Sequence, residues 1–391
     1  MRKVAVVGVG QTKFSGAQRR TNIELFSEAA LEAIAGAGLK TGDIQALHVG
    51  NVLSDFEEGQ QLAHPFIAEN LGLKNIPTNT FDGACASSSV AIRDAFIWIA
   101  SGMYDVILVG GMERAASMGT QLATQAYSMY TDRSYEYPSG ITFPGVFAML
   151  AHLYAKKYGI PMDKLKEQMA LVSVKAHKYG LLNPKAHLQR ELTVEKLLRS
   201  PMVCQPLQVY DCCPFSDGAA AIVLASEEIA RKLTDRPVFI TGSGQASAGT
   251  LASQQEYLPH LIARELAAKQ AYDTAGLTPR DIDVCEVHDS FSIAEILAIE
   301  SLGFFEYGTG GEATARGETM IGGKIAVNPS GGLKAKGHPV GATGAAQVYE
   351  IFHQLRGECG ETQVQGAATG LTDAMGASGS IHCVMILERG W

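Results

Sequence analysis

Residues 37–44 read AGLKTGDI and residues 275–282 read AGLTPRDI, so the pattern AGLxxxDI occurs twice, 238 residues apart. A second pattern, GxGQ, precedes each copy, at residues 8–11 and 242–245, which are 234 residues apart. Two short matches at nearly the same offset predict that the chain consists of two similar halves. The period is too long for a solenoid, whose repeats span roughly 20–50 residues.

Each half has the same order of predicted elements. A β-branched run, Val4–Val9 or Val238–Thr241, leads into an amphipathic helix. In the first half this helix opens with the capping box Thr21-x-x-Glu24. The glycine of each Ala-Gly-Leu is typical of a helix stop.

A strand, a helix that opens at a glycine-rich turn, and two final strands complete each half. The expected ranges are 46–52, 83–100, 105–111 and 218–226 in the first half, and 283–288, 337–355, 363–369 and 380–388 in the second. This alternation predicts an α/β protein in which sheets and helices form layers.

One long segment, 119–204, has no counterpart in the second half and is rich in Tyr, Met, Lys and His. We therefore expect residues 1–118 with 205–235 to form the first half, and 236–391 to form the second. An insertion of this length is typical of a lid or a ligand-binding excursion, although it can also be a purely structural elaboration.

The overall composition narrows the class of protein. The 391 residues are 46% hydrophobic, enough for a large core, and the net charge of -8 argues against nucleic acid or an anionic membrane as the main partner. No window of 18 uncharged apolar residues predicts a membrane span, and the N-terminal apolar run is better explained as a strand than as a signal peptide. Seven irregularly spaced cysteines indicate a reducing compartment, so we expect a cytoplasmic protein. No paired CxxC motif is present, so no metal site is expected in this chain.

Cys85 is the first candidate catalytic residue. It lies among small residues in GACASSS, at residues 83–89, just before a predicted helix. A helix N-terminus lowers the pKa of a thiol, and the thiolate is the nucleophilic form. A free cysteine can equally be a small buried apolar side chain.

Two histidines could serve that thiol. His338 lies in NPSGGLKAKGHPVGATG, at residues 328–344, where dense glycine suits close approach of the backbone to a ligand. Pro339 restricts the conformation of His338, as suits an imidazole held for proton transfer. His288 ends a predicted strand, where α/β proteins often place active groups, but a core histidine is an equal possibility.

Four motifs together resemble the thiolase superfamily. The glycine-rich 328–344 segment is similar to the thiolase signature NPSGGLxAxGHPxGATG, and GGMERAAS at 110–117 resembles the glycine–glutamate turn of thiolases. HDSF at 288–291 and PFSDGAA at 214–220 resemble elements of the branch that includes the sterol-carrier-protein thiolases. Archaeal and bacterial thiolases that pair with a small zinc-ribbon/OB-fold subunit are especially similar.

This resemblance implies a thiolase fold with two βαβαβαββ halves in a layered αβαβα arrangement and an inserted loop domain. It implies an acyltransferase that cleaves or forms a β-ketoacyl-CoA, with coenzyme A as a substrate and no permanently bound cofactor. Cys85 would carry the acyl group, His338 would activate it, and His288 and His338 would stabilise the enolate. An oxyanion hole would come from the backbone of Cys85 and of Met375 or Gly376.

The resemblance also suggests partners and further binding residues. A homodimer or a dimer of dimers is expected, with a possible zinc-ribbon/OB-fold subunit besides the acyl-CoA substrates. Substrate contacts are expected from Ser330, Gly331, Ser243 and Ser247.

The chain departs from most thiolases at the second catalytic cysteine. Asp373 and Ser290 stand where that thiol is usual. An ordinary carboxyl or hydroxyl group does not match the proton affinity of a thiol. Either His288 or His338 has two tasks, or burial raises the pKa of Asp373, or the substrate needs less help.

Two other functions are compatible with these residues. A Cys/His/His trio also resembles that of decarboxylating β-ketoacyl synthases, which need no base for the α-proton. A catalytically silent thiolase-like scaffold for a partner protein is the third possibility.

Overall fold

The structure is a computed structural model that describes residues 2–391, and two sets of five strands dominate it. The first set is β1 (Val4–Gln11), β2 (Ala46–Gly50), β3 (Thr78–Phe81), β4 (Val106–Arg114) and β7 (Asp217–Ser226). The second set is β8 (Val238–Ser247), β9 (Val284–Glu286), β10 (Ala326–Val327), β11 (Thr369–Gly376) and β12 (Ile381–Arg389). Their spatial orders, β3-β2-β4-β7-β1 and β10-β9-β11-β12-β8, are the same. The predicted internal duplication is confirmed.

The two sets meet at their first strands. β1 and β8 pair antiparallel over three residues, from Val4 opposite Ile240 to Val6 opposite Val238, which joins the sets into one ten-stranded sheet. β2 pairs parallel with β3 and β4, and β9 pairs parallel with β10 and β11. The parallel strands direct their carboxyl ends toward one region, where polar side chains of both halves can meet.

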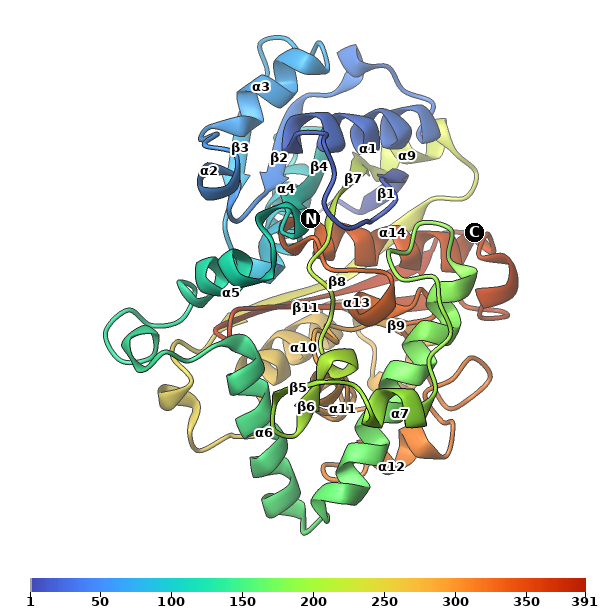
Figure 1. Ribbon diagram of the computed structural model, residues 1–391. Helices are drawn as coiled ribbons and strands as arrows, with labels where there is room; N and C mark the ends of the chain where they lie inside the picture. Colours follow the sequence, from blue (N-terminus) through green and yellow to red (C-terminus); the bar gives the residue numbers. More distant parts are fainter. Residues whose placement is uncertain (1) are drawn as a thin grey trace.

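Each set of five strands forms one sheet layer, and helices separate and cover these two layers, which gives five layers in all (Figure 1). α1 (Asn22–Gly36) covers the outer face of the first sheet, and α10 (Ile262–Ala275) covers that of the second. α4 (Ser87–Ser101) and α14 (Thr343–Arg356) lie against each other between the sheets. The predicted αβαβα arrangement is therefore confirmed. The remaining helices of four or more residues are α2 (Ser54–Glu57), α3 (Ala63–Asn70), α5 (Thr120–Ser128), α6 (Phe143–Tyr158), α7 (Met162–Leu182), α8 (Val194–Leu198), α9 (Glu227–Leu233), α11 (Ser292–Ser301), α12 (Gly310–Ala315) and α13 (Gly332–Ala335).

The duplicated GxGQ pattern has a packing reason. A Cβ atom on Gly10 would lie 2.1 Å from the carbonyl oxygen of Ala29 in α1. A Cβ atom on Gly244 would lie 1.9 Å from that of Ala267 in α10. The glycines thus allow each outer helix to lie directly on the first strand of its half.

The predicted helix ends are also confirmed. Thr21 and Glu24 form the capping box at the start of α1. Gly38 and Gly276, the glycines of the two Ala-Gly-Leu sequences, have φ values of +69° and +70° just after α1 and α10. A left-handed residue at this place ends a helix, and glycine adopts it without steric cost.

The strand predicted at 363–369 was wrong. That stretch is a loop with Gly366 at φ +77°, which follows the short 3-10 turn Gly360–Thr362, and the strand β11 begins only at Thr369. All eight residues of β11 are buried, so it lacks the polar–apolar alternation of a half-exposed strand. Because β11 is buried on both faces, it also contains glycines, Thr and Asp, a composition that is typical of a loop.

The segment 119–204 contains α5, α6, α7 and α8, with β5 (Met202–Cys204) at its end, shown in green in Figure 1. α6 and α7 pack against α11, and α7 also packs against α12 and α13 of the second half. Its description as a separate lid domain stays a prediction. Within residues 2–391 no helix is both long enough and apolar enough to cross a membrane.

Candidate active site

Cys85 lies in a short 3-10 turn, Ala84–Ala86, between β3 and α4. Ala84 has φ +50°, a strained value for a residue with a side chain. The hydroxyl of Ser87 accepts from the Gly83 amide at 2.9 Å and donates to the Ala84 carbonyl at 2.6 Å. These two bonds hold the tight turn that directs the sulfur of Cys85 away from the helix and into a cavity that it lines.

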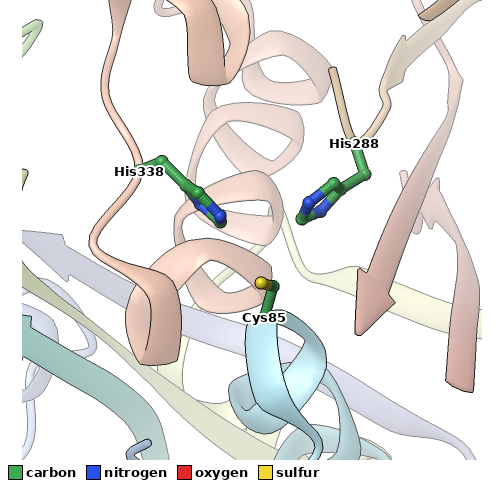
Figure 2. Close-up of side chains that lie close together, drawn as sticks. All are labelled: Cys85, His288 and His338. Carbon is green, nitrogen blue, oxygen red and sulfur yellow. The ribbon is translucent and has the colours of Figure 1, made fainter. Parts of the chain in front are cut away.

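The second half supplies two imidazoles to this sulfur. His288 follows β9 and His338 follows α13, and both rings point toward Cys85 (Figure 2). One atom from each of the three side chains lies within 4.8 Å of the others. The structure therefore brings together the three predicted catalytic residues. In residues 2–391 this trio is also the one group of three or more side chains placed to hold a metal ion.

Hydrogen bonds assign the proton on His338. Its Nδ1 lies 2.7 Å from the hydroxyl oxygen of Thr343, and that hydroxyl lies 3.1 Å from the carbonyl oxygen of Pro339. A carbonyl oxygen only accepts, so the hydroxyl hydrogen of Thr343 points to Pro339. Nδ1 of His338 must then donate to Thr343, which leaves Nε2 with a free lone pair. His338 is a base at its free nitrogen.

His288 has the opposite tautomer. Its Nδ1 lies 3.4 Å from the backbone nitrogen of Met375, and a backbone N–H only donates. Nδ1 therefore accepts, and Nε2 carries the hydrogen. The backbone N–H of His288 donates to the Asp373 carboxylate at 3.3 Å, which fixes the residue in place. His288 is a hydrogen-bond donor at its free nitrogen.

Burial favours the neutral forms of all three side chains of the trio. Burial raises the pKa of the Cys85 thiol to about 12, so the expectation that the helix N-terminus lowers it was wrong. The sulfur precedes the first residue of α4, and the loss of hydration is the largest effect on this pKa. Burial lowers the pKa of His338 to about 3, and burial together with His338 lowers the pKa of His288 well below its usual value.

Two backbone amides are directed at the sulfur. Hydrogen bonds from the N–H groups of Ala377 and of Cys85 itself act to lower the pKa of the thiol. Ala377 has φ +54° in the turn between β11 and β12 and lines the cavity. The N–H of Met375 is used by His288, so the amide near the predicted Met375–Gly376 pair is that of Ala377. A Cβ on Gly376 would lie 2.2 Å from the carbonyl oxygen of Gly83, so this glycine lets the turn approach Cys85.

Asp373 is locked in an ion pair. Both of its carboxylate oxygens lie 3.1 Å from Nε of Arg264, and both side chains are fully buried. Burial acts to raise the pKa of Asp373, but Arg264 together with His382 and His288 outweighs it and holds that pKa well below its usual range. Asp373 does not line the cavity. These observations argue against the alternative in which burial raises the pKa of Asp373 toward neutrality and its carboxyl group transfers a proton.

Of the other residues predicted to belong to the site, one lines the cavity and four do not. Ser290 lines the cavity beside His288. Ser330 donates to Glu286 at 2.7 Å, and Gly331, at φ +101°, packs against Gly180 of α7. Ser243 and Ser247 are part of β8, and neither they nor Ser330 and Gly331 line the cavity of Cys85.

A cavity of about 500 Å³ surrounds the trio. Its walls come from both halves and from the inserted segment, including Tyr127, Phe143, Phe147, His177, His187, Arg190, Cys213, Phe215, Phe291, Lys334 and Ala377. The sequence did not identify most of these residues, because they are far apart along the chain. Lys334 lies in the glycine-rich segment of His338, but the same segment contains Lys336, and the sequence does not distinguish the two lysines.

Glu113 of the glycine–glutamate turn holds the loop after His338. Its carboxylate accepts from the backbone N–H groups of Val52, Leu53 and Gly341, each at 3.1 Å. The motif therefore ties the first half to the segment that carries His338. This structural role explains why the carboxylate of Glu113 is buried, and it requires no contact with substrate.

This fold is that of the thiolases. Residues 4–228 match the family model "Thiolase, N-terminal domain" and residues 244–389 match "Thiolase C-terminal domain-like". The chain therefore belongs to the thiolase family, and it is an acyltransferase of that family.

Two relatives illustrate the similarity. The chain is 42% identical to acetyl-CoA acetyltransferase of Methanothermobacter thermautotrophicus, with all of both chains covered. It is 34% identical to sterol carrier protein 2 of Bos taurus over 97% of this chain and 71% of that protein.

Two solved structures share the fold over the whole chain. The Ltp2–ChsH2(DUF35) aldolase superimposes with a TM-score of 0.84 at 26% identity, covering 99% of this chain and 97% of that one. Human mitochondrial 3-ketoacyl-CoA thiolase in complex with CoA superimposes with a TM-score of 0.75 at 20% identity, covering 100% and 98%.

Proposed function

We propose that this thiolase cleaves a β-ketoacyl-CoA, or forms one by Claisen condensation, through an acyl group carried on Cys85. The observation that carries the proposal is the pair of oppositely protonated imidazoles at one thiol in one cavity. Acyl transfer through a thioester requires a base for the proton of the thiol and a hydrogen-bond donor for the negative oxygen that forms, both at fixed positions.

In the first step Nε2 of His338 takes the proton of the Cys85 thiol as the sulfur attacks the β-carbonyl carbon. The oxygen of that carbonyl becomes negative and accepts hydrogen bonds from the N–H groups of Cys85 and Ala377. Such a donor contributes roughly 3 kcal/mol to the stability of the transition state.

In the second step the bond between the α and β carbons breaks. The acyl group stays on Cys85, and the other product leaves as an enolate of acyl-CoA. Nε2–H of His288 and the protonated His338 donate to the enolate oxygen. His338 then gives its proton to the α carbon, which completes the first acyl-CoA product.

In the last step the thiol of CoA gives its proton to His338 and attacks the acyl group on Cys85. The second acyl-CoA leaves and the cysteine regains a proton from His338. One histidine thus carries the proton in every step. This accounts for a chain in which Asp373 is held by Arg264 and Ser290 stands where a second thiol is usual.

Coenzyme A fits the basic mouth of the cavity. Arg190 and Lys196 lie over the Tyr210 ring, with their charged groups 5.3 and 6.0 Å from its centre, and Arg199 lines the neighbouring hollow. Arg190 lines the cavity itself, and Lys196 and Arg199 line the neighbouring hollow, where Arg199 pairs with Glu195. Exposed cations around the Tyr210 ring suit the phosphates of the nucleotide. The inserted segment supplies all three, as expected of a binding excursion.

Acyl transfer to Cys85 can be tested directly. The protein is incubated with acetyl-CoA and the Cys85 peptide is analysed by mass spectrometry, beside Cys85→Ala and Cys359→Ala as the matched control. The wild type and Cys359→Ala should become acetylated at Cys85 and cleave acetoacetyl-CoA with CoA, whereas Cys85→Ala should do neither while keeping its fold. Wild-type turnover in Cys85→Ala would contradict the mechanism. Activity with malonyl thioester alone would indicate a decarboxylating synthase instead.

We further propose a homodimer that forms at the free edge of β3. Large apolar side chains are exposed on neighbouring elements, at Phe56, Leu62, Phe66 and Ile97. Phe66→Glu should therefore convert the dimer to a monomer in light scattering, while Met149→Glu, a change on the inserted segment, should not.

A small DUF35 subunit and a cytoplasmic location complete the proposal. The similar Ltp2 chain is paired with a DUF35 subunit in its structure, which supports such a partner here. All seven cysteines are free, which suits a reducing compartment. Co-expression with a DUF35 protein encoded beside this chain should give one complex in gel filtration.

A further inference from the structure

One buried cation that lines the cavity makes no direct ion pair with a side chain of the described residues. Lys334 of α13 is only 1% exposed, and it lines the same cavity as Cys85. Its Nζ donates to the backbone carbonyl of Tyr210 at 2.7 Å. Among the described residues 2–391, no carboxylate oxygen lies within 4.0 Å of that nitrogen.

The other buried lysines of this region are paired. Nζ of Lys175 lies 2.6 Å from Glu295, and Nζ of Lys336 lies 3.7 Å from Glu286 and 3.6 Å from Glu350. Burying an ammonium group without a partner is costly, so proteins usually provide one. Lys334 differs from its neighbours because it faces a cavity rather than a packed core.

The walls of the cavity contain no acidic side chain. Lys334 and Arg190 are the charged groups in the described lining, and the remainder is apolar, aromatic or neutral. Two carboxylates of the surrounding core act on Lys334 from beyond 4.0 Å. Asp211 pairs with Lys166, whereas Asp289 accepts from the Leu333 amide at 2.7 Å through one oxygen and has no hydrogen-bond partner at the other. Neither side chain lines the cavity. A bound anion would therefore meet Lys334 without competition from a carboxylate of the wall.

The two cations have different tasks. Arg190 is exposed at the mouth of the cavity, where the phosphates of CoA would lie. It therefore cannot bind an anionic group deep in the cavity. Lys334 is buried, so an anion that reaches it must belong to the acyl part of the substrate. We propose that Lys334 recognises a carboxylate on the acyl part, so that the preferred substrate is a β-ketoacyl-CoA with a second carboxylate.

This inference rests on the proposed thiolase activity and makes its substrate class narrower. An ammonium–carboxylate bond in a site that excludes water discriminates strongly, because a substrate without the carboxylate leaves the lysine unpaired. A hydrogen bond between charged groups contributes roughly 1.5–3 kcal/mol, which corresponds to about 10- to 150-fold in kcat/KM.

The test compares three substrates with the wild-type protein. Acetoacetyl-CoA carries no second carboxylate, 3-oxoadipyl-CoA carries one on the acyl group that moves to Cys85, and 2-acetylsuccinyl-CoA carries one on the part that leaves as the enolate. We expect one of the two carboxylated substrates to exceed acetoacetyl-CoA at least 10-fold in kcat/KM. Which one does so tells where the carboxylate is bound.

Two variants connect that preference to Lys334. Lys334→Met should reduce the ratio of carboxylated to uncharged substrate to about one, and Lys334→Arg should keep part of it. Lys178→Met removes an exposed lysine of α7 and should leave the ratio unchanged. Succinyl-CoA should also inhibit the wild type more strongly than butyryl-CoA, a measurement that needs no variant.

The outcomes are distinct. Equal kcat/KM for all three substrates in a wild type that cleaves acetoacetyl-CoA would overturn the inference and leave the proposed function intact. A Lys334→Met protein that folds and keeps the preference would also overturn it. No cleavage of any β-ketoacyl-CoA by the wild type would overturn the proposed function itself.

Discussion

The imidazole rings of His288 and His338 are nearly perpendicular, with their centres 5.1 Å apart and their planes at 86°. At this separation two imidazolium ions would repel each other strongly in a buried site. The positive charge of His338 accordingly lowers the pKa of His288, in addition to the effect of burial. The pair therefore holds one extra proton at most, which is the proton that Cys85 releases.

The first prediction concerns the pH dependence of Cys85. Because burial raises the pKa of the thiol to about 12, the fraction of reactive thiolate should rise tenfold per pH unit from pH 7 to 10. Inactivation of the free enzyme by iodoacetamide should therefore accelerate over this range without a plateau. Mass spectrometry should locate the adduct on Cys85, and Cys359→Ala should behave as the wild type. A rate that is constant above pH 6 would show a thiolate–imidazolium pair instead.

The second prediction concerns Thr343 as a positioning residue for His338. Thr343→Val keeps the shape of the side chain but removes the acceptor of the Nδ1 hydrogen, so the free nitrogen no longer stays unprotonated. We expect kcat to fall 10- to 100-fold, about 1.4–2.7 kcal/mol, with KM within twofold. Thr343→Ser retains the hydroxyl and should restore most of the rate. A Thr343→Val enzyme with normal kcat would exclude this role.

The third prediction separates a structural Asp373 from a catalytic one. Asp373→Asn leaves Arg264 as an unpaired buried cation, so the free energy of unfolding should fall by about 3–5 kcal/mol. Asp273→Asn breaks the exposed pair with Lys269 and should cost less than about 1 kcal/mol. Urea denaturation measures both. An Asp373→Asn protein as stable as the wild type but inactive would identify Asp373 as a proton carrier.

Much of this architecture was predictable because short motifs mark places where backbones must approach. The repeated AGLxxxDI and GxGQ sequences gave the two halves and the packing of α1 and α10. Cys85, His288 and His338 were recognisable because each stands beside glycine or a turn at the end of an element. Their meeting in one cavity confirms that these signals are local consequences of one fold.

What the sequence could not give depends on three-dimensional contacts. β11 was misplaced because a strand buried on both faces has no alternation to detect. The shift from Met375 to Ala377 depends on which amide His288 already uses. The lack of a direct ion pair at Lys334 is visible only once the distances from its ammonium group to the surrounding carboxylates are known.

The last prediction tests the packing of an outer helix on its sheet. A methyl group on Gly244 would lie 1.9 Å from the carbonyl oxygen of Ala267, and the backbone of α10 cannot yield without leaving β8. Gly244→Ala should therefore lower the free energy of unfolding by about 3 kcal/mol, at the upper end of usual overpacking costs. Gly42→Ala is the matched control, because a Cβ there meets nothing within 4 Å and its φ is not positive. If both substitutions are equally mild in urea denaturation, close approach of helix and strand is not what the duplicated glycine is for, and the GxGQ pattern needs another explanation.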